Sequence, residues 1–352
     1  MTAIFSLTAL AVAIYILSVI TDQFFIISLD RIALRWKLPS NVAGASLMAM
    51  GSSAPELSIA VLALFKEGGA HSDMGIGTIV GSAVFNILVI TGVCAVIREA
   101  RITLPIIVRD TVFYLMSILI LLVTFWDGRI TVSDALVFLM FYAGYLAFLF
   151  MAPIKEIDPV EELEAAEKEI QTGGGLFSRI NAKISRVVGW AAGNPEEQYL
   201  RAFGVSILLI VLISWFLVDT AIIFSNAVGI PPVIVALTIL AAGTSAPDLI
   251  ASILVARQGR GDMAVANAVG SNIFDILVGL GLPWALALLF LGRPVIAVGT
   301  EDLFLSVLIL MGTVVVLFTF LYTDRLLSKK EGWGLLGLYA AYVVWTVITG
   351  TG

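Results

Sequence analysis

Apolar runs long enough to form membrane helices recur along almost the whole chain. The sequence has 352 residues, of which 60% are hydrophobic and 13% charged, whereas an ordinary soluble domain carries roughly 25% charged residues. A helix of about 20 apolar residues spans a bilayer. The alternating ten-residue strands of an outer-membrane barrel are absent from the sequence. These features predict an all-α membrane protein.

Charged, glycine and proline positions divide the apolar runs into ten predicted transmembrane helices. They cover residues 3–28, 40–65, 75–97, 105–126, 131–152, 202–226, 231–256, 263–291, 302–321 and 333–350. The first run has no positive charge before it and continues past Phe24, so we expect a retained helix and not a signal peptide. The polar segment 153–201, with an acidic run between Glu156 and Glu169, is predicted to be a cytoplasmic linker loop. It separates two five-helix halves, residues 1–152 and 202–352.

The positions of the basic residues predict the orientation of the helices. If the N-terminus lies outside, all of the 20 Lys and Arg residues except Lys66, Arg129 and Arg293 fall at inward-facing segments. Cytoplasmic loops of membrane proteins retain Lys and Arg. We therefore predict that both termini lie outside.

The near absence of cysteine and histidine excludes several kinds of site. Cys94 is the only cysteine and His71 the only histidine. The sequence therefore lacks the residues needed for an intrachain disulfide, a cysteine metal site or a histidine-based hydrolytic triad. We expect neither an enzyme nor a bound cofactor.

The two halves share a pair of motifs. Gly51-Ser-Ser-Ala-Pro-Glu56-Leu57 matches Gly243-Thr-Ser-Ala-Pro-Asp248-Leu249, and a Gly-Ser-x-x-Phe-Asn/Asp motif ends at Asn86 and again at Asp275. The repeats cover about residues 40–97 and 231–291. Because five spans separate equivalent helices, the two repeats are predicted to be inverted, an arrangement found in secondary transporters.

Each repeat carries an acid inside an apolar span. Glu56 and Asp248 lie well within spans two and seven, and no basic residue is near either in sequence. An intramembrane carboxylate costs on the order of 3 kcal/mol unless it is compensated. A bound cation or a proton is therefore the expected compensator.

Other oxygens of the repeats are candidate ligands. Proline directly before each acid disturbs the preceding turn, which we expect to free carbonyls around Ala49 and Ser52 and around Ala241 and Thr244. Hydroxyl groups come from Ser53, Ser245, Ser82 and Ser271, and further side-chain oxygens come from Asn86 and Asp275.

Some of these residues have a second interpretation. Asn86 and Asp275 also suit helix bridging, and Ser82 and Ser271 suit hydrogen bonds to their own helices. Asp22 and Asp219 stand alone in spans one and six, and we expect them near a membrane face. An oxygen-only ligand set favours calcium and alkali cations over transition metals.

At these motifs the sequence resembles the calcium/cation antiporter superfamily, and within it the potassium-dependent sodium/calcium exchangers. Residues 43–57 and 77–88 are similar to the first alpha repeat of that branch, and residues 237–250, 261–265 and 269–276 are similar to the second. The Gly-Asn-x-x-Glu motifs of the proton-coupled branch are missing.

The resemblance implies a function and a set of roles. Glu56 and Asp248 become the central calcium ligands, and Ser53, Ser82, Asn86, Ser245, Ser271 and Asp275 complete the calcium, sodium and potassium positions. Aspartate at 248 and an acid at 275 are associated with potassium dependence in the family, although some prokaryotic exchangers keep the latter without it. The implied function is exchange of calcium for sodium with potassium co-transport. The alternatives are a potassium-independent exchanger, a proton-coupled cation antiporter and a passive channel.

The partners expected from the sequence are inorganic cations and the lipid bilayer. Nucleic acid is not expected as a partner, and no obligatory protein partner is evident. The chain differs from animal exchangers in its short linker and in lacking a long N-terminal extracellular region. The short linker leaves no room for a calcium-sensing domain of ordinary size. We expect a multi-pass protein of a prokaryotic cytoplasmic membrane.

Overall fold

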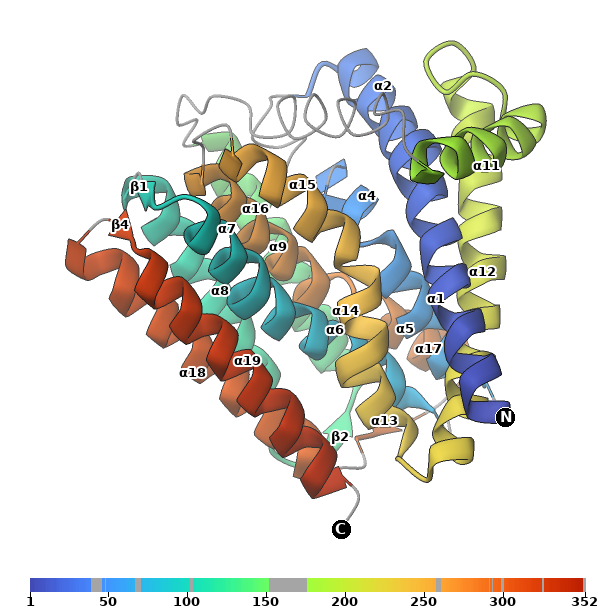
Figure 1. The fold of residues 1–352 in the computed structure, drawn as a ribbon. Helices are drawn as coiled ribbons and strands as arrows, with labels where there is room; N and C mark the ends of the chain where they lie inside the picture. The colour runs from blue at the N-terminus through green and yellow to red at the C-terminus, as the bar shows by residue number, and fades with distance from the viewer. Residues whose placement is uncertain are drawn as a thin grey trace.

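Long apolar helices make up nearly all of the structure, as the hydropathy of the sequence predicts. The computed structural model describes residues 1–38, 46–47, 49–66, 71–101, 104–151, 176–257, 261–290, 292, 294–298, 301–324 and 326–350. Within these ranges, nine helices are long and apolar enough to cross a membrane. They pack side by side in one tilted bundle, and both chain ends lie at its lower end in Figure 1.

The helices of the first half follow the predicted spans, with two differences. They are α1 (Thr2–Ile20), η1 (Thr21–Ile26), α2 (Ile27–Trp36), α4 (Ala49–Ser52), α5 (Ala54–Phe65), α6 (Ser72–Phe85), η4 (Asn86–Ile90), α7 (Thr91–Ile97), α8 (Leu104–Phe125) and α9 (Val132–Met151). The second predicted span contains α4 and the 12-residue α5, while its first residues, 40–45, lie outside the described part. Ten crossings therefore stay a prediction.

The first helix is longer than predicted. It runs without interruption from Thr2 to Trp36, whereas the sequence placed its end at residue 28. The added turns are amphipathic: Leu29 and Ile32 are buried, and Arg35 is exposed. A helix continues past charged positions when they share its polar face.

The helices of the second half agree with their predicted spans to within four residues. They are α12 (Tyr199–Val228), α13 (Pro232–Val235), η5 (Ala236–Leu240), α14 (Ala241–Thr244), α15 (Ala246–Arg257), α16 (Gly261–Leu277), α17 (Gly281–Phe290), α18 (Glu301–Asp324) and α19 (Lys329–Gly350). Between the halves, α11 (Leu176–Ala192) is a helix within the segment predicted as a loop, and it packs against α1 and α12. The acidic run of that segment lies outside the described residues.

Helices from the two halves pack in reciprocal pairs. Helix α8 packs against α16 and α18 packs against α6, while α9 packs against α17 and α19 packs against α7. Helices α1 and α12 pack against each other. Exchanging the halves leaves this pattern of contacts unchanged.

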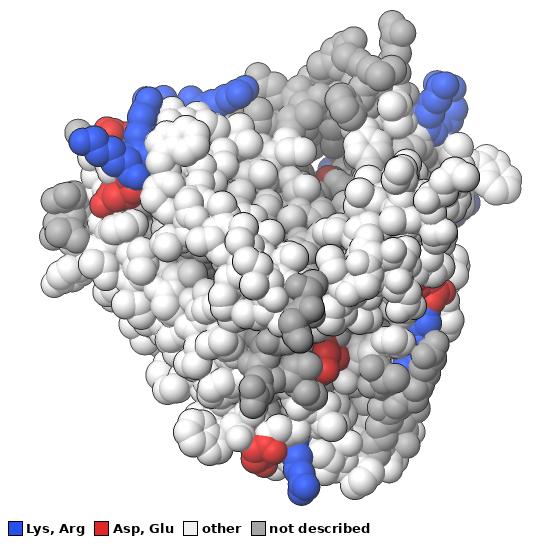
Figure 2. Space-filling view, turned by 60° about the horizontal axis from the view of Figure 1, so that its bottom comes forward, with Lys and Arg blue, Asp and Glu red and all other residues white. Residues whose placement is uncertain are grey.

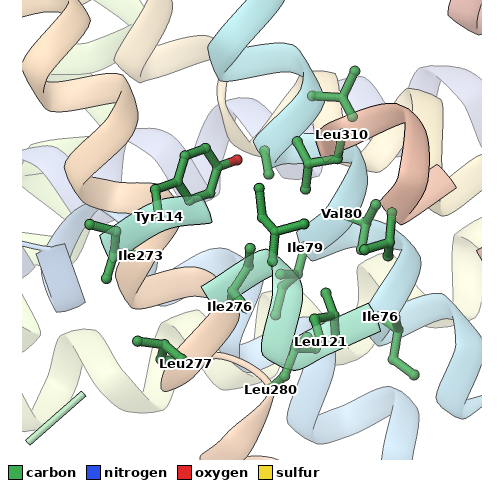
Figure 3. Packing of buried hydrophobic residues seen from close by; sticks show 14 of the residues in the cluster. Ile76, Ile79, Val80, Tyr114, Leu121, Ile273, Ile276, Leu277, Leu280 and Leu310 are labelled. Atoms are coloured by element: carbon green, nitrogen blue, oxygen red, sulfur yellow. The ribbon is translucent and has the colours of Figure 1, made fainter. Parts of the chain in front are cut away.

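The largest core lies where the halves meet. Figure 3 shows buried residues of four helices pointing toward one another: Ile76, Ile79 and Val80 of α6, Tyr114 and Leu121 of α8, Ile273, Ile276 and Leu277 of α16, and Leu310 of α18. Gly81 permits this close packing of α6. A Cβ at that position would lie 2.3 Å from the Leu237 carbonyl oxygen, so only glycine fits the crossing of α6 with η5.

Short strands pair loops of the first half with loops of the second. Strand β1 (Ala100–Arg101) pairs with β4 (Leu326–Leu327), and β2 (Arg129–Ile130) pairs with β3 (Ile296–Ala297), both antiparallel. Figure 1 places β1 and β4 at the upper end of the bundle and β2 at the lower end. These two-residue strands were not predicted from the sequence.

The outer surface suits a hydrocarbon environment. Uncharged residues cover most of the face in Figure 2, and Lys and Arg occur in small groups near its edges. Large apolar side chains such as Val12, Leu212 and Val315 are at least half exposed. Exposed apolar surface of this extent marks contact with a membrane or a partner. Together with the nine apolar helices found among the described residues, it makes the chain a multi-pass integral membrane protein.

Candidate functional site

Two matched helix breaks carry the repeated acids. Ser53 separates α4 from α5 with φ −90° and ψ 6°, and Ser245 separates α14 from α15 with φ −86° and ψ 0°. Each break precedes a proline, which cannot donate a backbone hydrogen bond. Glu56 and Asp248 therefore stand in the first turn of a new helix, where the helix dipole favours negative charge.

The carbonyls of Ala49 and Ala241 stay hydrogen-bonded at the two breaks. The Ala49 carbonyl accepts a hydrogen bond from the Ser53 amide at 3.0 Å, and the Ala241 carbonyl accepts one from the Ser245 amide at 3.2 Å. The carbonyl that proline deprives of a donor is the one four residues before it, which belongs to Gly51 or Gly243. Each of the two hydrogen-bonded oxygens also accepts a side-chain hydrogen bond, from Ser52 to Ala49 at 3.4 Å and from Thr244 to Ala241 at 3.3 Å.

The acids of one half meet hydroxyl groups of the other. The Glu56 carboxylate lies close to the Thr244 side chain, and the Asp275 carboxylate lies close to the Ser53 side chain. Glu56 is 4% and Asp275 3% exposed. Folding therefore brings the two motifs, separated by about half the chain, next to each other.

The site holds more negative charge than the protein neutralises. Asp248 repels both Glu56 and Asp275 electrostatically. None of the ion pairs found among the described residues includes these three acids. Because a buried charge without a partner is costly, the arrangement favours a cation or protons as the missing partner.

Several oxygens of the site are buried and have no hydrogen-bond partner. They are Glu56 Oε2, Asp275 Oδ1, Asn86 Oδ1 and Ser245 Oγ. Buried polar atoms are nearly always paired, so these atoms point to a ligand. In the described part of the chain no three His, Cys, Asp or Glu side chains lie close enough to hold a metal by themselves. A cation here would also need hydroxyl, amide or carbonyl oxygens, which suits calcium and sodium.

The remaining predicted residues lie on α6, η4 and α16. The Ser82 hydroxyl donates to the Ile79 carbonyl at 2.9 Å and the Ser271 hydroxyl donates to the Asn267 carbonyl at 3.1 Å. Each serine therefore binds its own helix, and the lone pairs of its oxygen stay available. Ser52 similarly donates to the Ala49 carbonyl at 3.4 Å.

Two residues at the site, Asn272 and Asp22, were not predicted as part of it from the sequence. Asn272 is fully buried and accepts a hydrogen bond of 2.9 Å from the Asn86 amide. Asp22 was expected near a membrane face, but it lines a pocket with Asp248 and repels it electrostatically. The available signals were the position of Asn272 inside the second motif and the isolated acid at Asp22.

The backbone near these residues is irregular in a way the sequence did not predict. The π-helix η1 contains Thr21 and Asp22, and the π-helix η4 begins at Asn86. Segments of π-helix inside α-helices occur frequently at functional sites. In the second half, α16 ends at Leu277 and a turn follows.

An apolar helical bundle that buries uncompensated acids from both halves defines a membrane transporter for cations. The chain belongs to a known family of such transporters, since the sequence model described as "Sodium/calcium exchanger protein" matches residues 5–151 and 199–348. The members of this family are exchangers, not enzymes. The unmatched residues 152–198 fall in the segment that separates the halves.

The chain is similar to animal exchangers along most of its length. It is 29% identical to human "Sodium/potassium/calcium exchanger 4", over 95% of this chain and 79% of that protein. It is 30% identical to human "Sodium/potassium/calcium exchanger 5", over 78% of this chain and 69% of that protein.

Two solved structures share the fold. The sodium-calcium exchanger NCX_Mj superposes with a TM-score of 0.60 at 21% identity, covering 97% of this chain and 98% of that chain. The H+/Ca2+ exchanger CAX superposes with a TM-score of 0.66 at 15% identity, covering 99% of this chain and 85% of that chain. At these identities the likeness extends to the fold alone.

Proposed function

We propose that the protein exchanges calcium for sodium by alternating access at the site between its halves, with potassium co-transported with calcium. The observation that carries this proposal is the pair of contacts from Glu56 to Thr244 and from Asp275 to Ser53. A site assembled from both halves changes its exposure when the halves move relative to each other. Because the empty site is multiply negative, the protein switches sides only when a cation load neutralises it.

The proposed ligands are the residues predicted from the repeats. They are Glu56, Asp248, Asp275, Asn86, Ser53, Ser245, Ser82, Ser271, Ala49, Ser52, Ala241 and Thr244. Calcium takes 6 to 8 oxygens at roughly 2.3 to 2.6 Å. The four unpartnered oxygens of the site support the central members of this set.

We further propose that the halves are inverted repeats, with both termini outside the cell. The reciprocal packing of α8 on α16 and α18 on α6 supports the repeat. The loop strands pair with non-equivalent partners, β1 with β4 at one end of the bundle and β2 with β3 at the other. This pairing supports inversion, because inverted repeats carry equivalent loops to opposite ends. The distribution of Lys and Arg supports the orientation.

Potassium co-transport rests on Asp248, Asp275 and the names of the relatives. The curated relatives described above are called sodium/potassium/calcium exchangers. With a second acid, the site would retain negative charge after calcium binds, and this charge would attract a monovalent cation.

We also propose a prokaryotic cytoplasmic membrane as the location, because the linker between the halves is short.

A proton-coupled calcium antiporter is the second candidate. The specific observation in its favour is that the ion pairs among the described residues include none of the acids Glu56, Asp248 and Asp275. Buried carboxylates without basic partners bind protons as readily as they bind cations.

Calcium uptake into reconstituted vesicles separates these functions. Sodium-loaded vesicles should take up calcium when the external sodium is removed, and external potassium should stimulate the uptake. Uptake driven by a pH gradient alone would favour the second candidate. Calcium flux without any counter-ion gradient would indicate a channel. Uptake that ignores potassium would leave sodium/calcium exchange and remove potassium from the proposal.

A further inference from the structure

A narrow pocket connects the first helix with the second acidic motif. It is lined by α1, η1, α4–α5 and α14–α15, and its polar residues are Asp22, Asp248, Thr21, Ser18, Ser52 and Thr244. None of the described residues that line it is Lys, Arg or His. The predicted ligands Asp248, Ser52 and Thr244 thus face residues of a helix outside the repeated motifs.

Asp22 is a second carboxylate of this pocket. The Ser18 hydroxyl donates a hydrogen bond of 3.2 Å to Asp22 Oδ2, and the charge of Asp248 acts on Asp22. Two like charges that share a partly enclosed pocket repel each other more strongly than they would in water. A cation between them would turn this repulsion into attraction.

Thr21 supplies an independent sign of a ligand. Its side chain is 3% exposed and lines the pocket, yet Thr21 Oγ1 has no hydrogen-bond partner. A hydroxyl in a helix ordinarily donates to a carbonyl of its own preceding turn, as Thr244 does to the Leu240 carbonyl at 3.0 Å. The π-helix η1 contains both Thr21 and Asp22, and its local geometry differs from that of the α-helical turns around it.

The other isolated acid of the chain shows what a compensated carboxylate looks like in this fold. Asp219 lies on α12, the helix that packs against α1. Asp22 and Asp219 have similar sequence surroundings, since Ser28 follows Asp22 at the same distance as Ser225 follows Asp219. Asp219 forms an ion pair with Lys66, and its side chain is 40% exposed. Asp219 therefore has a basic partner from the protein, whereas the pocket of Asp22 contains none.

We propose that Asp22, Thr21 and Ser18 form an accessory cation position beside Asp248, and that it takes a monovalent hard cation, sodium in particular. This inference rests on the proposed exchange and adds a residue outside the repeats to it. One carboxylate of its own and two hydroxyls offer too few oxygens for calcium, which takes 6 to 8. A sodium ion held here lies next to Asp248 and loads the central site from the α1 side.

The test compares Asp22→Asn with Asp219→Asn, the same chemical change at an acid that does not line the pocket. Sodium-dependent calcium exchange is measured in vesicles as a function of sodium concentration and, separately, of calcium concentration. Loss of a charged ligand contact should raise the half-saturating sodium concentration roughly tenfold or more in Asp22→Asn. The half-saturating calcium concentration should stay near the wild-type value. Asp219→Asn should keep the wild-type sodium dependence, and Asp22→Glu should recover most of it.

An unchanged sodium dependence in Asp22→Asn would overturn the inference. An equal loss of sodium and calcium affinity would also overturn it, because Asp22 would then only support the central site.

A second measurement keeps this inference separate from the exchange itself. Thermal unfolding of the purified protein is followed in sodium chloride and in choline chloride at equal ionic strength, since a bound ion stabilises the folded state. Sodium should raise the unfolding temperature of the wild type more than that of Asp22→Asn. If the wild type fails to exchange calcium but sodium still stabilises it more than Asp22→Asn, the accessory position is supported and the proposed function is rejected. Equal stabilisation of both proteins would contradict the accessory position.

Discussion

The Asn86 amide donates a hydrogen bond of 2.9 Å to the Asn272 side-chain oxygen, across the interface between the two halves. The Asn272 amide in turn donates to the Tyr114 hydroxyl at 3.0 Å and to the Ala83 carbonyl at 3.3 Å. This chain of bonds fixes the orientation of Asn86, whose own Oδ1 is buried without a partner. Asn272 is thus a positioning residue for a candidate ligand.

Replacing Asn272 should therefore weaken calcium binding. In Asn272→Leu the Asn86 amide loses its acceptor, at a cost of about 1–3 kcal/mol for a buried unpaired group. We expect the half-saturating calcium concentration for sodium-driven uptake to rise roughly tenfold. Tyr114→Phe removes only the hydroxyl that meets Asn272 and should have a smaller effect in the same direction. A folded Asn272→Leu protein with wild-type calcium dependence would remove Asn272 from the site.

Neutralising either repeated acid should abolish exchange. Removing the carboxylate that pairs with a buried cation costs about 3–5 kcal/mol, so Glu56→Gln and Asp248→Asn should each reduce sodium-driven calcium uptake at least about 100-fold. The matched control is Glu196→Gln, because Glu196 has a half-exposed side chain that pairs with Arg31. Substantial uptake by either acid variant would show that the two motifs do not share one site.

Asp275 should determine the response to potassium. Asp275→Asn keeps the shape of the side chain and removes one negative charge beside Ser53 and Glu56. We expect sodium-driven uptake to persist while its stimulation by external potassium disappears. Initial rates measured with potassium or choline outside the vesicles test this expectation. Unchanged potassium stimulation in the variant would assign potassium coupling to other residues.

Gly81 should be intolerant of a side chain. A Cβ at this position would lie 2.3 Å from the Leu237 carbonyl oxygen and 2.8 Å from the Ala241 Cβ atom. Overpacking of this kind costs roughly 1–3 kcal/mol, so Gly81→Ala should lower the thermal unfolding temperature in detergent. Gly144→Ala is the control, because an added Cβ there meets nothing within 4 Å. Equal unfolding temperatures for the two variants would contradict the close crossing of α6 and η5.

Hydropathy predicted most of the helices because bilayer thickness fixes the length of an apolar span. The prediction was wrong for the end of the first helix. Arg31 and Arg35 suggested a break in the sequence, but the helix continues to Trp36 with Leu29 and Ile32 on its buried face. A helix can continue past charged residues when these residues lie on its polar face.

The acidic motifs were detectable because they are duplicated and chemically unusual in an apolar segment. Asn272 lies inside the second motif, but its counterpart in the first motif is Ala83, so the duplication did not mark it. Its partners Asn86 and Tyr114 lie in the other half of the sequence, and only folding brings them together. Asp22 was visible as an isolated acid, but its position opposite Asp248 depends on how α1 packs against the second repeat. The sequence did not predict that the Ala49 and Ala241 carbonyls keep backbone hydrogen bonds from Ser53 and Ser245 across the breaks.

Equilibrium binding of calcium-45 to the purified protein, with sodium as competitor, tests the central claim most directly. The claim is that Glu56 and Asp248, from opposite halves, hold calcium in a single site that sodium also occupies. Sodium should displace calcium completely and cooperatively from the wild type, and Glu56→Gln and Asp248→Asn should each lose calcium binding. Calcium binding that sodium does not displace, or that survives in either variant, would contradict a shared site.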